Sequence, residues 1–328
     1  MKLQQLWYRA NPWIWLLSPL SFMFWLVTHA RRALYSNGLL PRYRPDVPVI
    51  VVGNISVGGN GKTPLVIWLV EMLREAGYRP GIVSRGYGGQ AKQYPLRVTP
   101  DVAARECGDE PKLMFERCQC PVAVDPDRRA AVKLLLSSGE VNIIVCDDGL
   151  QHYALARDIE LVVLDGERRH GNGRLLPMGP LREGLWRLKR VDAVICNGGL
   201  AAVGEYPMQL KPEAPRALNP DIQALPPQGE IDALAGIGYP PRFFKTLQLA
   251  GYRLRQTVSY ADHQDYSASE LQQQFSELPL LMTEKDAVKC RSFARDNWWY
   301  LPVSADLPRS FRDLILNKLK DNPYGARS

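Results

Sequence analysis

The stretch Val49–Pro64, VIVVGNISVGGNGKTP, decides the fold of this chain. Its apolar run Val49–Val52 predicts a buried strand, and a glycine-rich turn follows that strand. After Lys62 and Thr63, apolar residues recur with helical spacing over Leu65–Leu73. A strand, a glycine-rich turn, Gly-Lys-Thr and a helix in this order predict a phosphate-binding loop.

Each part of this loop serves the binding of phosphate. Glycines let several backbone N–H groups point into one concavity, and the start of the helix adds partial positive charge. We expect Lys62 to reach the β- and γ-phosphates of a nucleotide and the Thr63 hydroxyl to bind Mg²⁺. The strict pattern has glycine where this chain has Ser56, and a glycine-rich turn with an incidental lysine is the alternative. The predicted nucleotide-binding residues are Ser56, Val57, Gly58, Gly59, Asn60, Gly61, Lys62, Thr63 and Pro64.

Length and composition limit the classes of protein that fit. The chain has 328 residues, which is enough for two domains. Six cysteines without C-x-x-C spacing and four scattered histidines disfavour a zinc site or a disulfide framework. The net charge is +7, and residues 1–45 contribute six basic side chains and no acidic one. This excess lies beside an apolar segment, so we predict contact with an anionic membrane surface and no nucleic-acid partner.

That apolar segment, Pro12–Thr28, carries no charged residue and is followed by Arg31 and Arg32. It is short for a membrane span, which needs about 20 residues, and Pro19 is expected to kink it near its middle. We predict a helix lying in the cytoplasmic leaflet of a membrane. A single span and a buried core helix are the alternatives, and a cleaved signal peptide is disfavoured because arginines and a nucleotide site follow.

Acidic residues elsewhere are candidates for metal binding and proton transfer. The apolar run Val141–Cys146 predicts a strand that ends in Asp147 and Asp148, the expected Mg²⁺-holding partners of a phosphate loop. Asp109 and Glu110 precede a predicted helix. They could act as a general base and a metal ligand, or only favour the helix dipole.

Three further features of the sequence each allow a functional and a structural interpretation. Arg85 follows a predicted strand at residues 80–84 and either contacts phosphate or is an exposed loop residue. Residues 170–183 are rich in Gly, Pro and Arg, which suits either a loop around an anionic substrate or a long surface connection. His263, flanked by Asp262 and Asp265, is either structural or shares a proton with a catalytic acid across a cleft.

The order of elements predicts the fold class. Short strands and helices alternate between residues 49 and 197, which predicts a P-loop NTPase-like, doubly wound and mostly parallel sheet. A proline-rich stretch at 200–228 marks a boundary, and strands at 231–237, 252–260, 279–283 and 298–303 predict a second, smaller α/β lobe. We therefore divide the chain into an N-terminal membrane-associated helix (1–36), a P-loop lobe (37–205) and the smaller lobe (206–328).

Several motifs in this order resemble the tetraacyldisaccharide 4′-kinases, the lipid A 4′-kinases of Gram-negative bacteria. Thr283–Asp286 also looks superficially like a guanine-reading motif, but no residue separates Lys285 from Asp286, which weakens a GTPase interpretation. The resemblance spans nearly the whole chain and rests on Gly53–Pro64, Ser84–Gly89, Gly108–Pro111, Asp147–His152, Gly171–Pro177, Gly179–Glu183, Asp262–His263 and Thr283–Asp286.

The resemblance implies an ATP- and Mg²⁺-dependent kinase at the cytoplasmic face of the bacterial inner membrane. Its lipid disaccharide substrate would be a tetraacylated glucosamine disaccharide 1-phosphate, phosphorylated on its 4′-hydroxyl to give lipid IVA in lipid A (lipopolysaccharide) biosynthesis. Asp109 would be the catalytic base, supported by His263. The remaining implied roles are nucleotide and Mg²⁺ ligands (Lys62, Thr63), a Mg²⁺ shell (Asp148, Asp147, Glu110) and substrate contacts (Arg85, Asn172, Arg182, Glu183).

Two other classes of protein compete with a lipid kinase. A membrane-peripheral switch ATPase would use the same phosphate loop but needs no pocket for an acceptor. A lipid-binding scaffold with a degenerate loop is a third possibility, and the intact Lys62, Thr63 and Asp148 argue against it.

Overall fold

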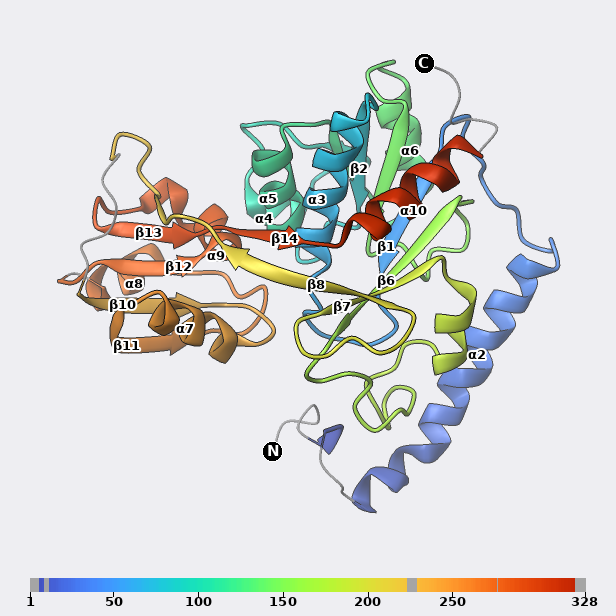
Figure 1. Cartoon of the computed structure of the whole chain (residues 1–328), viewed down its shortest axis with the longest axis horizontal. Coiled ribbons are helices and arrows are strands. Elements are labelled where there is room, and N and C mark those ends of the chain that lie inside the picture. Colours follow the sequence, from blue (N-terminus) through green and yellow to red (C-terminus); the bar gives the residue numbers. More distant parts are fainter. Residues whose placement is uncertain (1–5, 9–11, 223–228, 276, 322–328) are drawn as a thin grey trace.

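The computed structural model describes residues 6–8, 12–222, 229–275 and 277–321, which form two α/β lobes lying side by side (Figure 1). The larger lobe contains a nine-stranded sheet in the order β14-β8-β7-β6-β1-β5-β2-β4-β3. Its strands are β1 (Val49–Gly53), β2 (Pro80–Ser84), β3 (Leu96–Arg97), β4 (Val122–Val124), β5 (Ile143–Asp147), β6 (Ile159–Asp165), β7 (Ala193–Asn197), β8 (Glu205–Pro212) and β14 (Val303–Asp306).

The smaller lobe contains a five-stranded sheet in the order β11-β10-β12-β13-β9. Its strands are β9 (Arg216–Ala217), β10 (Glu230–Ala235), β11 (Arg253–Ser259), β12 (Leu280–Thr283) and β13 (Trp298–Leu301). The α-helices of the chain are α2 (Ser18–Ser36), α3 (Lys62–Glu75), α4 (Ala104–Cys107), α5 (Asp109–Cys118), α6 (Arg128–Leu136), α7 (Pro240–Leu249), α8 (Ala268–Gln274), α9 (Glu284–Cys290) and α10 (Arg309–Lys320). The 3₁₀ turns are η1 (Pro12–Leu17), η2 (Leu185–Arg190) and η3 (Arg291–Phe293).

The large sheet is parallel except at its two edges, where β14 and β3 pair antiparallel with their neighbours. All five residues of β1 are buried, as is typical of a parallel strand covered on both faces. Apolar side chains of α3, α5 and α10 pack on one face of the sheet, and those of α6 pack on the other. The expected α/β class with a doubly wound, mostly parallel sheet and a second lobe is confirmed.

The end of the chain returns to the larger lobe, which differs from the expected division at residue 205. The single strand expected over residues 298–303 is two strands, and Pro302 separates them: β13 belongs to the small sheet and β14 to the large one. Proline has no N–H to donate, so a continuous ladder is interrupted there. Phe311, Ile315 and Leu319 of α10 are fully buried in the core of the larger lobe. Residues 205–212, expected as part of the connection between lobes, form β8 inside the large sheet.

The N-terminal helix lies along the outside of the larger lobe (Figure 1). The expected kink at Pro19 is absent from the middle of α2, because Pro19 occupies the first turn, where a missing N–H costs little. In η1 and α2 the buried residues are Ile14 and Ser21. The buried core-helix alternative is therefore wrong, and the segment is long and apolar enough to cross a membrane by length and composition.

Candidate active site

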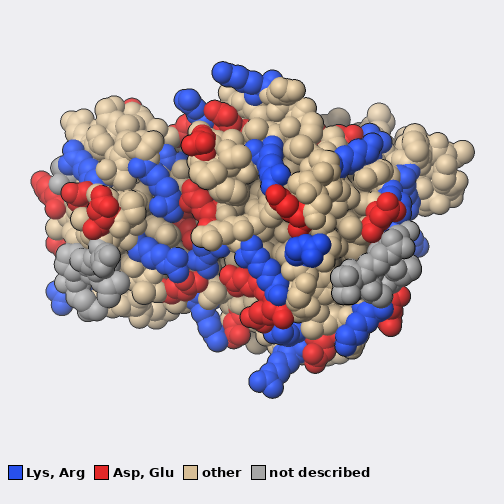
Figure 2. Space-filling view, turned by 90° about the horizontal axis from the view of Figure 1, so that it is seen from above, with Lys and Arg blue, Asp and Glu red and all other residues tan. Residues whose placement is uncertain are grey.

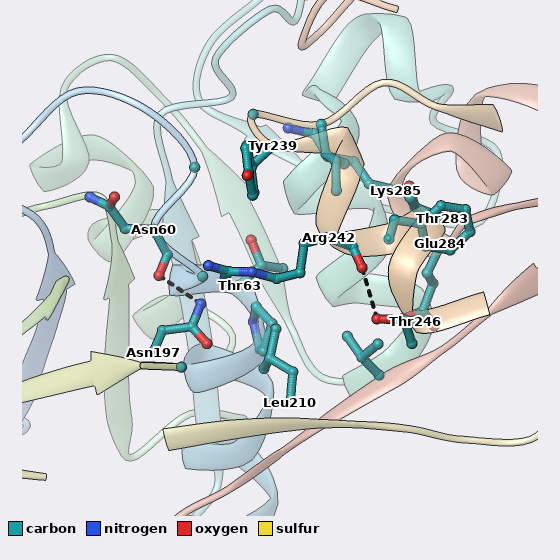
Figure 3. Close-up of a pocket in the computed structure, with 18 of the residues that line it drawn as sticks. Asn60, Thr63, Asn197, Leu210, Tyr239, Arg242, Thr246, Thr283, Glu284 and Lys285 are labelled. Carbon is teal, nitrogen blue, oxygen red and sulfur yellow. Dashed lines mark hydrogen bonds between the residues drawn. The ribbon is translucent and has the colours of Figure 1, made fainter. Parts of the chain in front are cut away.

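The phosphate loop runs from β1 to α3, and its own side chains fix its shape. Gly61 ends the loop with φ 88°, a left-handed conformation that favours glycine, and a Cβ there would lie 2.2 Å from the Asn197 side chain. The Asn60 side chain donates to Ser56 Oγ at 3.1 Å, and Asn197 donates to the Asn60 carbonyl at 3.1 Å (Figure 3). Ser56 therefore holds the loop together where the strict pattern has glycine.

The smaller lobe approaches this loop closely. A Cβ on Gly238 would lie 2.9 Å from the Gly59 nitrogen, so two glycines allow the backbones to meet. A cleft of about 580 Å³ lies between the lobes, with Asn60 and Thr63 on one side and Tyr239, Arg242 and Lys285 on the other (Figure 3). The loop residues from Gly59 to Pro64 line it, together with Glu110, Asn197, Asp262, Thr283 and Glu284.

Positive charge surrounds Asp148 at the end of β5. Lys62 Nζ lies 3.5 Å from Asp148 Oδ1, and Arg182 Nη1 donates to the same carboxylate at 3.2 Å. The Arg128 guanidinium donates to the Asp148 carbonyl at 3.2 Å. Burial alone would raise the pKa of Asp148, but Lys62 and Arg182 together lower it to about 2. Asp148 is therefore ionised at neutral pH and draws two cations toward the phosphate loop.

Asp147 is buried beside the loop because β5 pairs with β1, with Val52 opposite Asp147. Ser84 Oγ donates to Asp147 Oδ2 at 3.0 Å, whereas Oδ1 is buried and has no hydrogen-bond partner among the described residues. Burial and the nearby Glu110 raise the pKa of Asp147 to about 7. A buried carboxylate oxygen without a partner is the kind of ligand that Mg²⁺ prefers.

Asp109 and His263 come from different lobes and meet beside Glu110 and Asp262, which line the cleft. His263 Nδ1 lies 3.3 Å from Asp109 Oδ2, and the Lys289 ammonium lies 3.9 Å from the same oxygen. Burial would raise the pKa of Asp109, but the His263 imidazole and the nearby ammonium groups lower it. His263 has φ 63°, and its ring packs against the Tyr87 ring in a T-shaped arrangement, with ring centroids 5.0 Å apart. The predicted pair of a carboxylate and a supporting histidine is thus brought together.

Lys285 lies beside this pair. It was not predicted from the sequence as a site residue. Its Nζ lies 2.8 Å from Asp262 Oδ1, 3.1 Å from Glu110 Oε1 and 3.4 Å from His263 Nε2. Burial disfavours the ammonium, yet Glu110 and Asp262 raise the pKa of Lys285 above its usual value. The only sequence signal for it was the motif at 283–286. In that motif Asp286 is structural, because it accepts hydrogen bonds from the Gly236 nitrogen and the Tyr266 hydroxyl.

Comparison with known proteins identifies the family to which these motifs belong. The family model described as tetraacyldisaccharide-1-P 4′-kinase matches residues 13–320. The chain belongs to this family. It is 60% identical over 318 residues to the tetraacyldisaccharide 4′-kinase of Aeromonas hydrophila, covering 97% of this chain and 96% of that protein. It is 56% identical over 324 residues to the protein of the same name from Tolumonas auensis, covering 99% of each.

A solved structure of a family member has the same fold. The crystal structure of LpxK from Aquifex aeolicus in complex with ATP matches with a TM-score of 0.77 and 30% identity, covering 93% of this chain and 99% of that chain. Family membership, the two-lobed α/β fold and the apolar N-terminal helix therefore all agree with the resemblance drawn from the motifs.

Of the residues expected to contact the acceptor in this kinase family, Arg182 reaches the site, where it binds Asp148. Arg85 is exposed on the loop after β2. Asn172 shapes its own loop by donating to the Met178 carbonyl at 2.9 Å. Glu183 forms a buried ion pair with Arg187 at 3.1 Å and does not line the cleft. The substrate roles of these four residues stay predictions.

Proposed function

We propose that this chain transfers the γ-phosphate of ATP to the 4′-hydroxyl of a tetraacylated glucosamine disaccharide 1-phosphate, with Asp109 as the general base. The product is lipid IVA, an intermediate of lipid A biosynthesis. Membership of the 4′-kinase family supports the reaction. The observation that carries the proposal for the residues is the position of Asp109. Its carboxylate is buried next to Glu110 of the nucleotide cleft and faces His263 of the other lobe.

A sugar hydroxyl is a weak acid, so its attack needs a positioned base and stabilisation of charge on the phosphates. Asp109 is ionised at neutral pH because its pKa is lowered, and its Oδ2 faces His263. Its other oxygen accepts the hydroxyl proton. The hydroxyl oxygen then forms a bond to the γ-phosphorus, the bond between that phosphorus and the bridging oxygen breaks, and ADP leaves with the electron pair.

Cationic side chains stabilise the charge on the phosphates. Lys62 and Arg182 lie within 3.5 Å of Asp148, which holds them beside the phosphate loop. Thr63 and Asp147 are the residues best placed to hold Mg²⁺, with Asp148 and Glu110 next to them. In the described part of the chain no three acidic, histidine or cysteine side chains converge, so phosphate oxygens would complete the coordination. Mg²⁺ held by these residues would supply charge neutralisation at the phosphates.

The N-terminal helix suits a membrane-bound acceptor. Exposed apolar side chains form one stripe along η1 and α2, at spacings of three and four residues: Leu16, Leu20, Met23 and Val27. The other side of these helices is tied to the loop that carries Arg182: Ser21 Oγ donates to the Leu175 carbonyl at 3.0 Å, and the Arg174 guanidinium lies 4.4 Å from the Trp15 ring centroid. We infer that α2 lies in the cytoplasmic leaflet of the inner membrane and brings the cleft to the level of the lipid headgroups.

The proposal is tested with the full-length chain in detergent micelles, radiolabelled ATP and the lipid disaccharide, with mass spectrometry of the product. Asp109→Asn is expected to lower kcat by roughly 10²–10⁴-fold, the range of a general base, and to retain ATP binding. The matched control is Asp313→Asn, at an exposed position of α10. Near wild-type transfer by Asp109→Asn would remove Asp109 as the base. Hydrolysis of ATP without a phosphorylated lipid would favour the switch ATPase instead.

A further inference from the structure

The Lys285 side chain occupies the point where the two lobes meet beside the base. It comes from the first turn of α9 in the smaller lobe and is 11% exposed. It contacts Glu110 of the larger lobe at 3.1 Å and the imidazole of His263 at 3.4 Å. The proposed function gives roles to Asp109 and His263, but it leaves the purpose of this lysine open.

The chemistry of Lys285 fixes where the hydrogen of His263 lies. A lysine ammonium carries three N–H donors and no acceptor. The ring atom that faces it, His263 Nε2, must therefore accept a hydrogen bond through its lone pair. A neutral imidazole carries its hydrogen on one nitrogen only, so the hydrogen lies on Nδ1. Nδ1 lies 3.3 Å from Asp109 Oδ2, and in the described part of the chain both atoms are buried without a hydrogen-bond partner.

One neighbouring group acts in the opposite direction. Asp262 Oδ1 lies 3.7 Å from His263 Nε2 and would favour a hydrogen on that nitrogen. The same oxygen, however, already accepts a hydrogen bond from Lys285 at 2.8 Å. The ammonium is thus nearer to Nε2 than the carboxylate is, and a hydrogen on Nε2 would face a positive charge. Lys289 and the ring of Tyr87 complete the charged and aromatic surroundings of the pair.

We propose that Lys285 is a positioning residue, which selects the tautomer of His263 that donates from Nδ1 to Asp109. The inference rests on the proposed function of Asp109. In the other tautomer the lone pair of Nδ1 would face the lone pairs of the carboxylate. A hydrogen bond between them would then require a proton on Asp109, and a protonated carboxylic acid cannot accept the proton of the sugar hydroxyl. Lys285 thereby keeps Asp109 available as a base without touching the reacting atoms.

Other ion pairs hold the two lobes together at the same interface, which separates this role from a purely structural one. Arg117 of α5 pairs with Glu284 of α9 at 3.1 Å, and Arg291 pairs with Glu116 at 3.0 Å. Neither of these pairs contacts His263 according to the hydrogen bonds and ion pairs of the described residues. Loss of the Lys285 ammonium therefore leaves the interface in place while it removes the donor at Nε2.

The test measures the tautomer directly. The chain has four histidines, so the full-length protein labelled with ¹⁵N-histidine in detergent micelles gives a simple long-range ¹H–¹⁵N spectrum, and loss of one set of signals in His263→Gln assigns them. We expect a hydrogen on Nδ1 and none on Nε2 in the wild type and in Lys285→Arg. In Lys285→Met the hydrogen is expected to move to Nε2. Arg291→Met, which removes an ion pair between the lobes away from the histidine, is expected to keep the wild-type pattern.

Activity gives the second readout. Lys285→Met is expected to lower kcat by roughly 100-fold, the lower end of what a general base contributes, and Lys285→Arg to restore most of it. A hydrogen on Nε2 in the wild type would overturn the proposal even if Lys285→Met did not fold, and so would an unchanged tautomer in folded Lys285→Met. Failure of the proposed function would appear elsewhere, as unimpaired phosphate transfer by Asp109→Asn, and would leave the tautomer measurement intact.

Discussion

Replacing the exposed apolar stripe of α2 with serine is expected to release the enzyme from membranes. The side chains of Leu20, Met23 and Val27 are 58%, 57% and 61% exposed and lie at spacings of three and four residues on one face of the helix. Complete burial of such a side chain stabilises by about 1.5–3 kcal/mol. At about six tenths of that value, each residue contributes roughly 1–2 kcal/mol when the stripe enters the bilayer, and the three together roughly 3–5 kcal/mol.

Since 1.4 kcal/mol corresponds to a factor of ten, the triple serine variant is expected to partition into lipid about 10²–10⁴-fold less than the wild type. Flotation of the full-length protein with vesicles of anionic lipid measures this coefficient. Nucleotide binding is expected to persist because none of these three residues lines the cleft. The matched control Leu20→Met, Met23→Leu, Val27→Ile keeps the apolar surface and is expected to bind as the wild type does.

Two results would refute this reasoning. If the serine variant floated like the wild type, another surface would hold the enzyme on the membrane. If the control variant lost binding equally, the effect would come from a disturbed helix and not from the loss of apolar surface, and circular dichroism would show the change. Raised salt is expected to weaken the remaining binding, because Arg31 and Arg32 at the end of the apolar segment attract anionic headgroups.

Three further outcomes are expected. Lys62→Met is expected to abolish ATP binding measured by calorimetry, because Lys62 is the cation that we propose contacts the phosphates from this loop. Burial, with Arg128 nearby, lowers the pKa of His152 to about 4, so its contribution to stability is present above about pH 6.5 and lost as pH falls through 4. Between pH 7 and pH 4 the free energy of unfolding is expected to fall by about 3 kcal/mol less in His152→Gln than in the wild type. The unfolding midpoint of the variant is therefore expected to change less over this pH range. Phe311→Ala is expected to destabilise the chain to urea by about 3–5 kcal/mol, whereas Arg309→Ala on an exposed position of α10 is expected to change little.

The sequence predicted the features that depend on local pattern. The strand at 49–52, the phosphate loop and the helix after it follow one another along the chain, and their spacing carries the information. Asp147 and Asp148 were predictable because the carboxyl ends of parallel strands share one edge of a sheet. The return of β14 and α10 to the larger lobe had no such signal. It depends on which sheet a strand joins after Pro302, and tertiary contacts decide that.

The contacts of Lys285 could not be predicted from the sequence for a similar reason. Its partners Glu110 and His263 are 175 and 22 residues away in the sequence, so no window of the chain shows them together. The motif that contains Lys285 resembles a guanine-reading motif only in its residue types. The structure places its ammonium, which can only donate hydrogen bonds, beside Nε2 of His263, and that contact indicates its role. Charged side chains of both signs lie side by side over the face in Figure 2, so charge pattern alone would not have singled it out.

The path of the chain between the lobes restricts how the site residues of one lobe can move relative to those of the other. The phosphate loop and Asp109 belong to the larger lobe, whereas His263 and Lys285 belong to the smaller one, so the proposed base has its partners only when the lobes are correctly placed. The chain crosses between the lobes after β8 and again at Pro302, and the Glu213 nitrogen donates to the Pro302 carbonyl at 2.9 Å. Two crossings bonded to each other restrict rotation of the smaller lobe more than one linker would. The returning C-terminal segment therefore belongs to the active site's architecture, because its burial in the larger lobe anchors the second crossing.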